Sequence, residues 1–202
     1  SETYGTAQYT PIDEKHPMRA QSPYSASKIS ADYLGMSYWN SFKMPIKIVR
    51  PFNVFGPRQS PRAVIPSIII QSLYNNKKIN LGNITPKRDY TYVTDTCDAF
   101  YKIYESKKVF GEIINVGTNK EFSISKIAKK IFNKLEVSPK IVNDEKRIRS
   151  KKSEVQRLLC NNKKIINLVN WKPKTNFDDG LIETIKWYQL NLDTFDPDIY
   201  HI

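Results

Sequence analysis

The sequence predicts an α/β fold built around a largely parallel sheet. Two observations predict this class. Short apolar runs with the composition of buried strands recur along the chain, and segments with a helical apolar period lie between them. Strands that alternate with helices favour parallel pairing, because each helix returns the chain to the starting end of the sheet. Ligands of such sheets bind beyond the carboxyl ends of the strands.

The first long helix is expected over Pro23–Phe42, because Ser22 is a good N-cap and proline suits the first helical position. Its apolar side includes Tyr33, Leu34 and Tyr38. Further helices are expected near Val64–Asn75, Asp95–Glu105, Ser123–Leu135, Asn161–Leu168 and Phe177–Leu190. Strands are expected at Pro45–Arg50, Ile79–Leu81, Tyr90–Val93, Glu112–Gly117 and Lys140–Val142. The loops Pro51–Arg58 and Gly117–Lys120 follow strands and are therefore candidate ligand loops.

Composition narrows the functional classes. The chain has 202 residues with 40% hydrophobic content, which allows one sizeable core, or a core with a small lobe. No apolar run approaches the roughly 20 residues that a membrane span needs, so no membrane partner is expected. Solvated lysine-rich faces are the simpler explanation of the net charge of +12, and the functional alternative is attraction of an anion such as a nucleotide diphosphate. No nucleic-acid motif is present, so no nucleic-acid partner is expected.

Cysteine and histidine usage points away from disulfides and metals. Cys97 and Cys160 are too few for a disulfide framework, which favours a reducing, cytoplasmic location. Cys97 lies on the predicted apolar side of its helix, with Ala99 and Phe100, and is expected in the core. His16 and His201 are isolated in the sequence, and no cluster has metal-ligand spacing.

Tyr24 and Lys28 form the first candidate site. They are four residues apart, so on a helix both project from one face. An ammonium beside a phenol favours the phenolate and lowers its pKa from about 10, so that the tyrosine can accept a proton from an alcohol. A surface helix with an ordinary tyrosine and lysine is the simpler explanation of this pair alone.

Several motifs occur in the order found in one enzyme family. They are Ser1–Gly5, Tyr24–Lys28, Arg50–Arg58, Arg88–Asp95, Asn115–Gly117, Arg149–Glu154 and Asn170–Pro173. Together they resemble the extended short-chain dehydrogenase/reductases that act on nucleotide sugars. Within that family the chain most resembles the NAD-dependent 4,6-dehydratases of UDP-N-acetylglucosamine (legionaminic-type) or GDP-mannose. The segments Tyr4–Gln8, Pro11–Glu14 and Arg62–Pro66 look like the UDP-N-acetylglucosamine enzymes. The resemblance implies the back portion of a Rossmann-like, doubly wound parallel sheet with a smaller C-terminal α/β substrate-binding lobe.

The resemblance also implies catalytic roles. Tyr24 matches the base that takes the O4 proton of the sugar, and Lys28 matches the lysine that binds the nicotinamide ribose. Glu2 matches the glutamate that removes the C5 proton before water leaves from C6. At Ser1, glucose-type dehydratases have an aspartate that protonates the leaving hydroxyl. A serine is a poorer acid, so Ser1 is expected to orient a water or that hydroxyl.

Binding roles follow from the same resemblance. Pro51 is expected to abut the nicotinamide of NAD beside Tyr24 and Lys28, with NADP as the alternative cofactor. Asn53 matches the asparagine that hydrogen-bonds the substrate phosphate, although asparagine also suits loops. Arg88 and Arg149 match arginines that clamp the nucleotide diphosphate, since a guanidinium fork binds phosphate oxygens in pairs. Val64 is expected to line the nucleotide pocket, with Arg58 and Arg62 adding positive charge.

The seven glycines, 5, 35, 56, 82, 111, 117 and 180, lie too far apart to form the glycine-rich turn that binds a dinucleotide pyrophosphate. The expectation is a chain that lacks the N-terminal Rossmann portion of the enzyme and binds NAD weakly by itself. Residues 1–117 are assigned to the C-terminal part of the NAD-binding domain, interleaved with substrate-lobe segments at about 53–92. Residues 118–202 are assigned mainly to the substrate lobe.

The function predicted from these residues is nucleotide-sugar 4,6-dehydration, with a nucleotide-diphosphate sugar as substrate and a homodimer as the assembly implied by the family. Two alternatives in the same superfamily are a nucleotide-sugar 4-epimerase and a UDP-glucuronate decarboxylase. The Ser1-Glu2 pair disfavours a simple epimerase. An alternative of another class is a non-catalytic sugar-nucleotide-binding module, which the missing glycine-rich turn favours.

Overall fold

The computed structural model describes residues 1–148, 150 and 153–195, and it confirms the α/β class. The strands of the described part are β1 (Ile48–Pro51), β2 (Asn53–Phe55), β3 (Lys78–Leu81), β4 (Lys87–Tyr92), β5 (Ile113–Val116), β6 (Glu121–Ser123), β7 (Lys140–Asn143) and β8 (Arg157–Leu158). The helices of the described part are α1 (Pro23–Phe42), α2 (Val64–Tyr74), α3 (Val93–Glu105), α4 (Ile124–Leu135), α5 (Lys163–Val169) and α6 (Phe177–Leu190). Short 3₁₀ turns are η1 (Glu2–Tyr4), η2 (Lys107–Val109), η3 (Glu145–Arg147) and η4 (Leu192–Thr194).

The described strands pair mostly in parallel, as the alternation of strands and helices predicts. β1 pairs with β5, β2 with β4, β3 with β7, and β8 with β4, all in parallel. The pairing of β4 with β6 is antiparallel. In these registers Arg50 lies beside Asn115, and Asn53 lies beside Tyr90. The site residues Pro51 and Asn53 therefore lie at the carboxyl end of β1 and at the amino end of β2.

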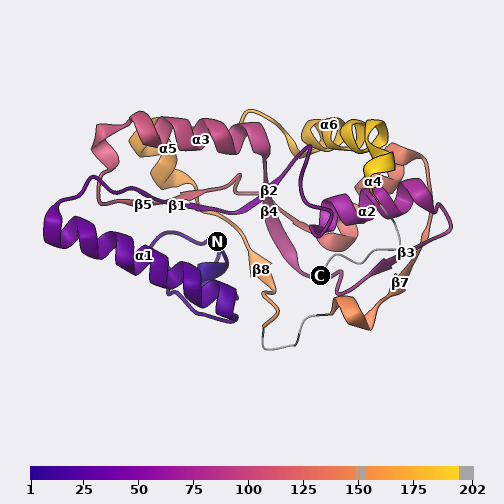
Figure 1. The fold of residues 1–202 in the computed structure, drawn as a ribbon, viewed down its shortest axis with the longest axis horizontal. Helices are drawn as coiled ribbons and strands as arrows, with labels where there is room; N and C mark the ends of the chain where they lie inside the picture. The colour runs from indigo at the N-terminus through magenta and orange to yellow at the C-terminus, as the bar shows by residue number, and fades with distance from the viewer. Residues whose placement is uncertain (149, 151–152, 196–202) are drawn as a thin grey trace.

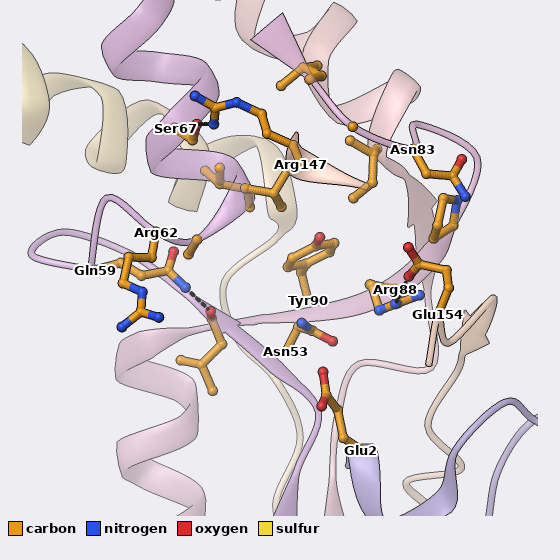
Figure 2. Close-up of a pocket in the computed structure, with 18 residues that line it drawn as sticks. Glu2, Asn53, Gln59, Arg62, Ser67, Asn83, Arg88, Tyr90, Arg147 and Glu154 are labelled. Carbon is orange, nitrogen blue, oxygen red and sulfur yellow. Dashed lines mark hydrogen bonds and ion pairs between the residues drawn. The ribbon is translucent and has the colours of Figure 1, made fainter. Parts of the chain in front are cut away.

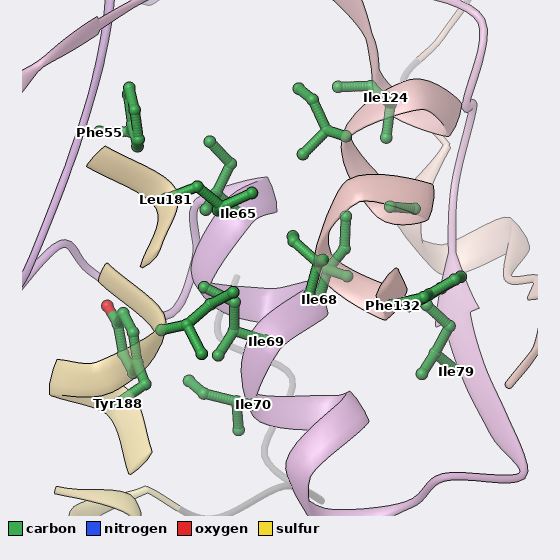
Figure 3. Close-up of a cluster of buried hydrophobic side chains, with 14 of the residues drawn as sticks. Phe55, Ile65, Ile68, Ile69, Ile70, Ile79, Ile124, Phe132, Leu181 and Tyr188 are labelled. Atoms are coloured by element: carbon green, nitrogen blue, oxygen red, sulfur yellow. The ribbon is translucent and has the colours of Figure 1, made fainter. Parts of the chain in front are cut away.

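Two regions of the fold have separate apolar clusters. Around β1 and β5, α3 and α5 lie on one side of the strands and α1 on the other (Figure 1). The cluster on the α3 side contains Ile103, Ile114, Ile165 and Trp171. The second region consists of α2, α4, α6, β3 and β7 (Figure 1), and its larger isoleucine-rich cluster includes Ile68, Ile127 and Leu181 (Figure 3). β2 and β4 lie between the two regions (Figure 1).

The cores do not divide the chain at a single point. Ile165 and Trp171 lie late in the sequence, yet they pack with α3 and β5. Phe55, which lies early, packs in the cluster of α2, α4 and α6. The domain boundaries drawn at residue 117 and about 53–92 remain a prediction, and these contacts show that segments cross between the two cores.

Local signals located the helices well. Ser22 Oγ accepts a hydrogen bond from Ser25 N at 3.1 Å, and Ser123 Oγ accepts one from Lys126 N at 3.2 Å. The bounds of α1 and α6 are those predicted. No helix within the described ranges is both long and apolar enough to span a bilayer.

The expectation for α3 is wrong in part. Its buried face runs through Asp95, Thr96, Ala99 and Ile103, so Cys97 is exposed rather than in the core. Phe100 is also exposed. The reason is that polar groups hold this helix. The Asp95 carboxylate accepts a hydrogen bond from Thr175 N at 2.8 Å. The backbone carbonyl oxygen of Asp95 accepts a hydrogen bond from the Trp171 indole at 3.1 Å. Apolar periodicity alone could not orient a helix that is held in this way.

Candidate active site

Glu2 and Tyr24 are brought together by a direct connection between η1 and α1. Ser25 is buried, and its hydroxyl donates to the Glu2 carbonyl oxygen at 2.7 Å. The Ser1 nitrogen donates to the Pro51 carbonyl oxygen at 3.1 Å, which places the start of η1 at the carboxyl end of β1. These two hydrogen bonds hold Glu2 between the first turn of α1 and the end of β1.

Tyr24 and Lys28 share one face of α1. The Lys28 ammonium lies 5.4 Å from the centroid of the Tyr24 ring, and the Tyr24 side chain is 59% exposed. Both residues line a cavity of about 500 Å³ at the end of β1. The other predicted residues that line it are Ser1, Glu2, Pro51 and Asn53. The structure therefore places every residue predicted for catalysis or cofactor binding around one cavity.

A second cavity, of about 330 Å³, lies between β2, β4 and the first turn of α2 (Figure 2). Of the predicted substrate-binding residues, Asn53, Val64 and Arg88 line it. Glu2 and Asn53 line both cavities, which are therefore neighbours. Arg149, the remaining predicted substrate ligand, lies outside the described residues.

Among the residues that the structure describes, three arginines bring positive charge to the second cavity, namely Arg62, Arg88 and Arg147. Arg88 is buried on β4 and forms an ion pair with Glu154, with 3.6 Å between the charged atoms. Arg147 contacts the Asp144 carboxylate at 3.0 Å, and its guanidinium donates to Ser67 Oγ at 3.4 Å. Guanidinium groups in a partly buried cavity are suited to phosphate oxygens, so this cavity can hold an anionic ligand.

Asn53 lies where the two cavities meet. Its Oδ1 atom is buried and has no hydrogen-bond partner in the described part of the chain. Buried side-chain polar atoms normally have partners, so an atom without one at a cavity wall indicates a ligand contact. Figure 2 shows the side chain between Glu2 and Tyr90, facing the cavity.

Sequence reasoning missed several residues of the second cavity, namely Gln59, Ser67, Asn83, Arg147 and Glu154. They come from α2, from η3 and from loops, and all except Glu154 lie outside the motif segments found in the sequence. A weak signal was available for Glu154, which ends the motif segment that begins at Arg149.

The loop Gly117–Lys120, predicted as a ligand loop, lines neither of these cavities. Its backbone instead binds a buried carboxylate, because Thr118 N and Asn119 N both donate to Asp89. Arg58 also lies outside the lining of both cavities. Of the two loops predicted from strand ends, the one after β1 therefore builds the site.

No group of three or more metal-ligating side chains occurs among the described residues. His16 is buried between the rings of Tyr4 and Tyr9. Its Nε2 atom accepts from Gln8 N at 2.9 Å, and its Nδ1 atom lies 2.8 Å from the Pro17 carbonyl oxygen. Both ring nitrogens have protein partners, so His16 serves the packing of residues 4–17.

Comparisons with known proteins agree with this geometry. Residues 1–184 match the family model described as GDP-mannose 4,6 dehydratase. The human dTDP-D-glucose 4,6-dehydratase is 33% identical over 193 residues, which cover 94% of this chain and 55% of that protein. The chain spans about half the length of the curated relatives it matches first.

Solved structures show the same fold. The dTDP-glucose 4,6-dehydratase of Bacillus anthracis, in complex with NAD, matches with a TM-score of 0.85 and 31% identity over 95% of this chain and 60% of that one. The UDP-glucuronic acid 4-epimerase of Bacillus cereus, in complex with UDP-glucuronic acid and NAD, matches with a TM-score of 0.85 and 27% identity at the same coverage. The chain belongs to the GDP-mannose 4,6 dehydratase family, among the Rossmann-fold epimerases and dehydratases of the extended short-chain dehydrogenase/reductases.

Proposed function

We propose that this chain carries the catalytic and substrate-binding residues of an NAD-dependent nucleotide-sugar 4,6-dehydratase. One observation carries the proposal. The Glu2 side chain lines both the cavity of Tyr24 and Lys28 and the cavity of Arg88. A sugar joined to a diphosphate held at Arg88 would thus reach a carboxylate and a tyrosine at once. Relatives whose names state 4,6-dehydratase activity on nucleotide sugars support this assignment.

The residues at the first cavity fit the nicotinamide end of the cofactor. Lys28 offers an ammonium donor, Tyr24 a hydroxyl and Pro51 an apolar ring on the wall of the cavity of about 500 Å³. When bound, NAD would supply the hydride acceptor at C4 of the sugar and the hydride donor at C6. NADP remains an alternative cofactor, since none of these groups distinguishes the two.

The protein groups would then move the protons. The Lys28 ammonium would stabilise the phenolate form of Tyr24, and this phenolate would accept the O4 proton. The resulting C4 ketone would make the C5 proton acidic. Glu2 would remove this proton and deliver it to the C6 hydroxyl, which then leaves as water. Ser1 would orient that hydroxyl from the wall of the same cavity. Asn53 and Arg88 would hold the diphosphate, with Val64 against the nucleoside, and Arg149 remains a proposed ligand of the nucleotide.

The test uses the intact protein that contains this chain. It would be incubated with UDP-, GDP- and dTDP-sugars, and the products would be read by mass. The expected product has lost one water. Glu2→Gln, which keeps the shape but removes the base, is expected to lower the rate of water loss by about 100-fold or more while the variant still binds the nucleotide. Thr194→Ala, on η4 and away from both cavities, is the matched control. A Glu2→Gln protein with the wild-type rate would contradict the assignment.

A second candidate is a nucleotide-sugar 4-epimerase. It is favoured by an epimerase structure that matches with a TM-score of 0.85, equal to that of the dehydratase. Epimerisation needs the tyrosine but no base at C5, so it predicts a product of unchanged mass and an active Glu2→Gln variant. The same incubation thus distinguishes the two reactions.

We also propose a cytoplasmic homodimer. Both cysteines are free thiols, which suits a reducing compartment. α1 exposes Leu34, Tyr38 and Phe42 at helical spacing, and an apolar stripe of this kind on a surface helix favours a self-complementary contact.

A further inference from the structure

Arg50 is a buried cation beneath α1, at the centre of the strand β1. Its side chain is 3% exposed. Nε donates to the Asp32 carboxylate at 2.7 Å, and one terminal nitrogen donates to the Tyr4 hydroxyl at 2.8 Å. The other terminal nitrogen contacts the Met18 sulfur at 3.0 Å. The guanidinium carbon also lies 5.0 Å from the centroid of the Tyr4 ring. All three nitrogens of this group are therefore engaged.

The Tyr4 hydroxyl extends this network to β5. It donates to Asn115 Oδ1 at 2.7 Å while it accepts from Arg50. Burial raises the pKa of Tyr4 to about 12, with Arg50 opposing the shift, so the hydroxyl keeps its proton at neutral pH. Arg50 and Asn115 are direct neighbours in the parallel register of β1 and β5. The Tyr4 hydroxyl thus forms hydrogen bonds with both members of this neighbouring pair, Arg50 on β1 and Asn115 on β5.

Stability alone does not account for a charged pair at this place. Desolvating an arginine and a carboxylate costs several kcal/mol, and well-packed apolar side chains of similar volume often do as well or better. Positions on β1 whose side chains face a helix would ordinarily carry valine or isoleucine, as Ile48 does two residues earlier. The ion pair differs from an apolar contact in its directional hydrogen bonds, because a guanidinium group holds each of its partners at a defined angle.

The partners of Arg50 are the two elements that carry the proposed catalytic groups. Asp32 lies four residues after Lys28 and eight after Tyr24, on the same face of α1. Tyr4 ends η1, which Glu2 begins. The Ser25 hydroxyl already joins α1 to the Glu2 carbonyl oxygen near the start of the helix. The path from Asp32 through Arg50 to Tyr4 is a second connection two helical turns further along. A helix attached to η1 at one point could still rotate about that point. Two points of attachment fix the orientation of α1 relative to η1.

We propose that Arg50 is a positioning residue that holds α1 and η1 in one orientation, so that Tyr24, Lys28 and Glu2 face the same sugar. The inference rests on the proposed dehydratase function, because it assigns the proton steps at O4 and C5 to these two elements. It predicts that losing the Arg50 fork separates the two steps. Each base would keep its chemistry, but Glu2 would no longer stand at the right distance from a sugar held by Tyr24.

The test is Arg50→Lys in the intact protein, since lysine keeps the charge but cannot hold Asp32, Tyr4 and Met18 together. The expected result is a fall in kcat of about 100-fold, the scale of a misplacement of about 1 Å, with KM for the nucleotide sugar within about twofold of wild type. Exchange of the C5 proton with deuterated solvent should slow more than oxidation at C4. Reduced cofactor should then accumulate during turnover.

Two further variants keep the inference testable if Arg50→Lys does not fold. Asp32→Asn weakens the link to α1, and Tyr4→Phe removes the hydroxyl that joins Arg50 to Asn115. Both should slow C5 exchange more than C4 oxidation, by smaller factors. The matched control is Arg157→Lys, because Arg157 also pairs with a carboxylate, Glu121 at 2.8 Å, but lines neither cavity. It should leave the ratio of the two steps unchanged.

A folded Arg50→Lys protein with wild-type kcat would overturn the inference. Equal loss of C4 oxidation and C5 exchange would do so as well, since a general structural defect slows both. A wild-type protein that releases no dehydrated product would overturn the proposed function, and with it the role of Arg50. Dehydration by the wild-type protein, together with an unchanged ratio of C5 exchange to C4 oxidation in Arg50→Lys, Asp32→Asn and Tyr4→Phe, would overturn the role of Arg50 alone.

Discussion

Asp89 is a fully buried carboxylate on β4, next to the pocket residue Arg88. Successive side chains of a strand point to opposite faces, so Asp89 faces away from the cavity that Arg88 lines. Its oxygens accept four hydrogen bonds, two from Thr118 at 2.9 and 2.6 Å, one from Asn119 N at 2.8 Å and one from Cys160 N at 3.2 Å. The carboxylate thus ties the loop after β5 and the segment after β8 to β4.

The ionisation of Asp89 makes a pH-dependent contribution to stability. Burial raises the pKa of Asp89 from 3.8 to about 6, and the hydrogen bonds oppose the rise. Between these two values the folded protein binds more protons than the unfolded chain, so the contribution is present at low pH and is lost as pH rises through about 6. From pH 5 to pH 7 the loss from this group is on the order of 1 kcal/mol.

We therefore predict the behaviour of Asp89→Asn in urea unfolding at pH 5, 6 and 7. The amide retains one acceptor oxygen for four donors, so the variant should be less stable by about 1–3 kcal/mol. The difference in the free energy of unfolding between wild type and variant should be smaller at pH 7 than at pH 5. The reason is that only the wild type loses stability through the ionisation of this carboxyl group. Parallel stability curves for the two proteins would show that Asp89 does not titrate in this range.

At the scale of elements, α1 is held at its C-terminal end by close packing on the turn before β5. Gly111 has a φ of 74°, and its nitrogen donates to the Ile46 carbonyl oxygen at 2.7 Å. A Cβ atom at this position would lie 2.1 Å from Trp39 Nε1 of α1. Gly35, inside α1, differs, since a Cβ atom there would meet the nearest atom, of Ile48, at 3.5 Å. The two glycines of this interface therefore tolerate a methyl group very differently.

Gly111→Ala should destabilise the protein by about 2 kcal/mol, because alanine disfavours the left-handed backbone and its methyl group displaces Trp39. Gly35→Ala should stabilise by about 0.5–1 kcal/mol, because alanine favours the helix and the new methyl group finds ordinary contact distances. Chemical unfolding of the intact protein measures both. A Gly111→Ala variant as stable as wild type would mean that Trp39 does not pack against this turn.

Elements with local signals could be predicted from the sequence, and elements defined by their partners could not. α1 and α6 begin at caps and follow an apolar period, so their bounds were predictable. β6 and β8 are three and two residues long and exist because they pair with β4. β2 lies in a segment whose prolines and glycine indicated a loop, yet it pairs with β4 and places Asn53 at the cavity.

The site residues also fall into two groups, those that a local sequence motif indicates and those that only long-range contacts define. Tyr24, Lys28 and Asn53 stand in short motifs, so the sequence alone identifies them as candidate site residues. The network of Arg50 joins residues 4, 18, 32 and 50, and no local pattern shows that these side chains meet. Arg147 reaches its cavity because η3 turns the chain beside α2, where it contacts Ser67. Long-range packing therefore accounts for what sequence reasoning missed.

At the scale of the whole molecule, α1 is notable for how little of it is buried. Ser25 is its one buried residue, whereas Leu34 is 61% and Phe42 is 73% exposed. Leu34, Tyr38 and Phe42 lie four residues apart, and the rings of Tyr38 and Phe42 are 5.7 Å from centroid to centroid. A contiguous apolar stripe on a long helix costs solvation free energy in water, which a second copy of the same stripe would recover.

The dimer proposed through this stripe makes a prediction about assembly. In a twofold contact each substitution occurs twice, so Leu34→Glu would place two carboxylates in or beside one apolar interface and shift the intact protein toward monomer. Leu190→Glu is the matched control, because Leu190 is 84% exposed at the end of α6, away from α1 (Figure 1). Sedimentation equilibrium at micromolar concentration measures both variants and the wild type. The expected result is a dimer for wild type and Leu190→Glu and a monomer for Leu34→Glu. A monomeric wild type, or a Leu34→Glu protein as dimeric as the control, would show that α1 does not form the dimer contact.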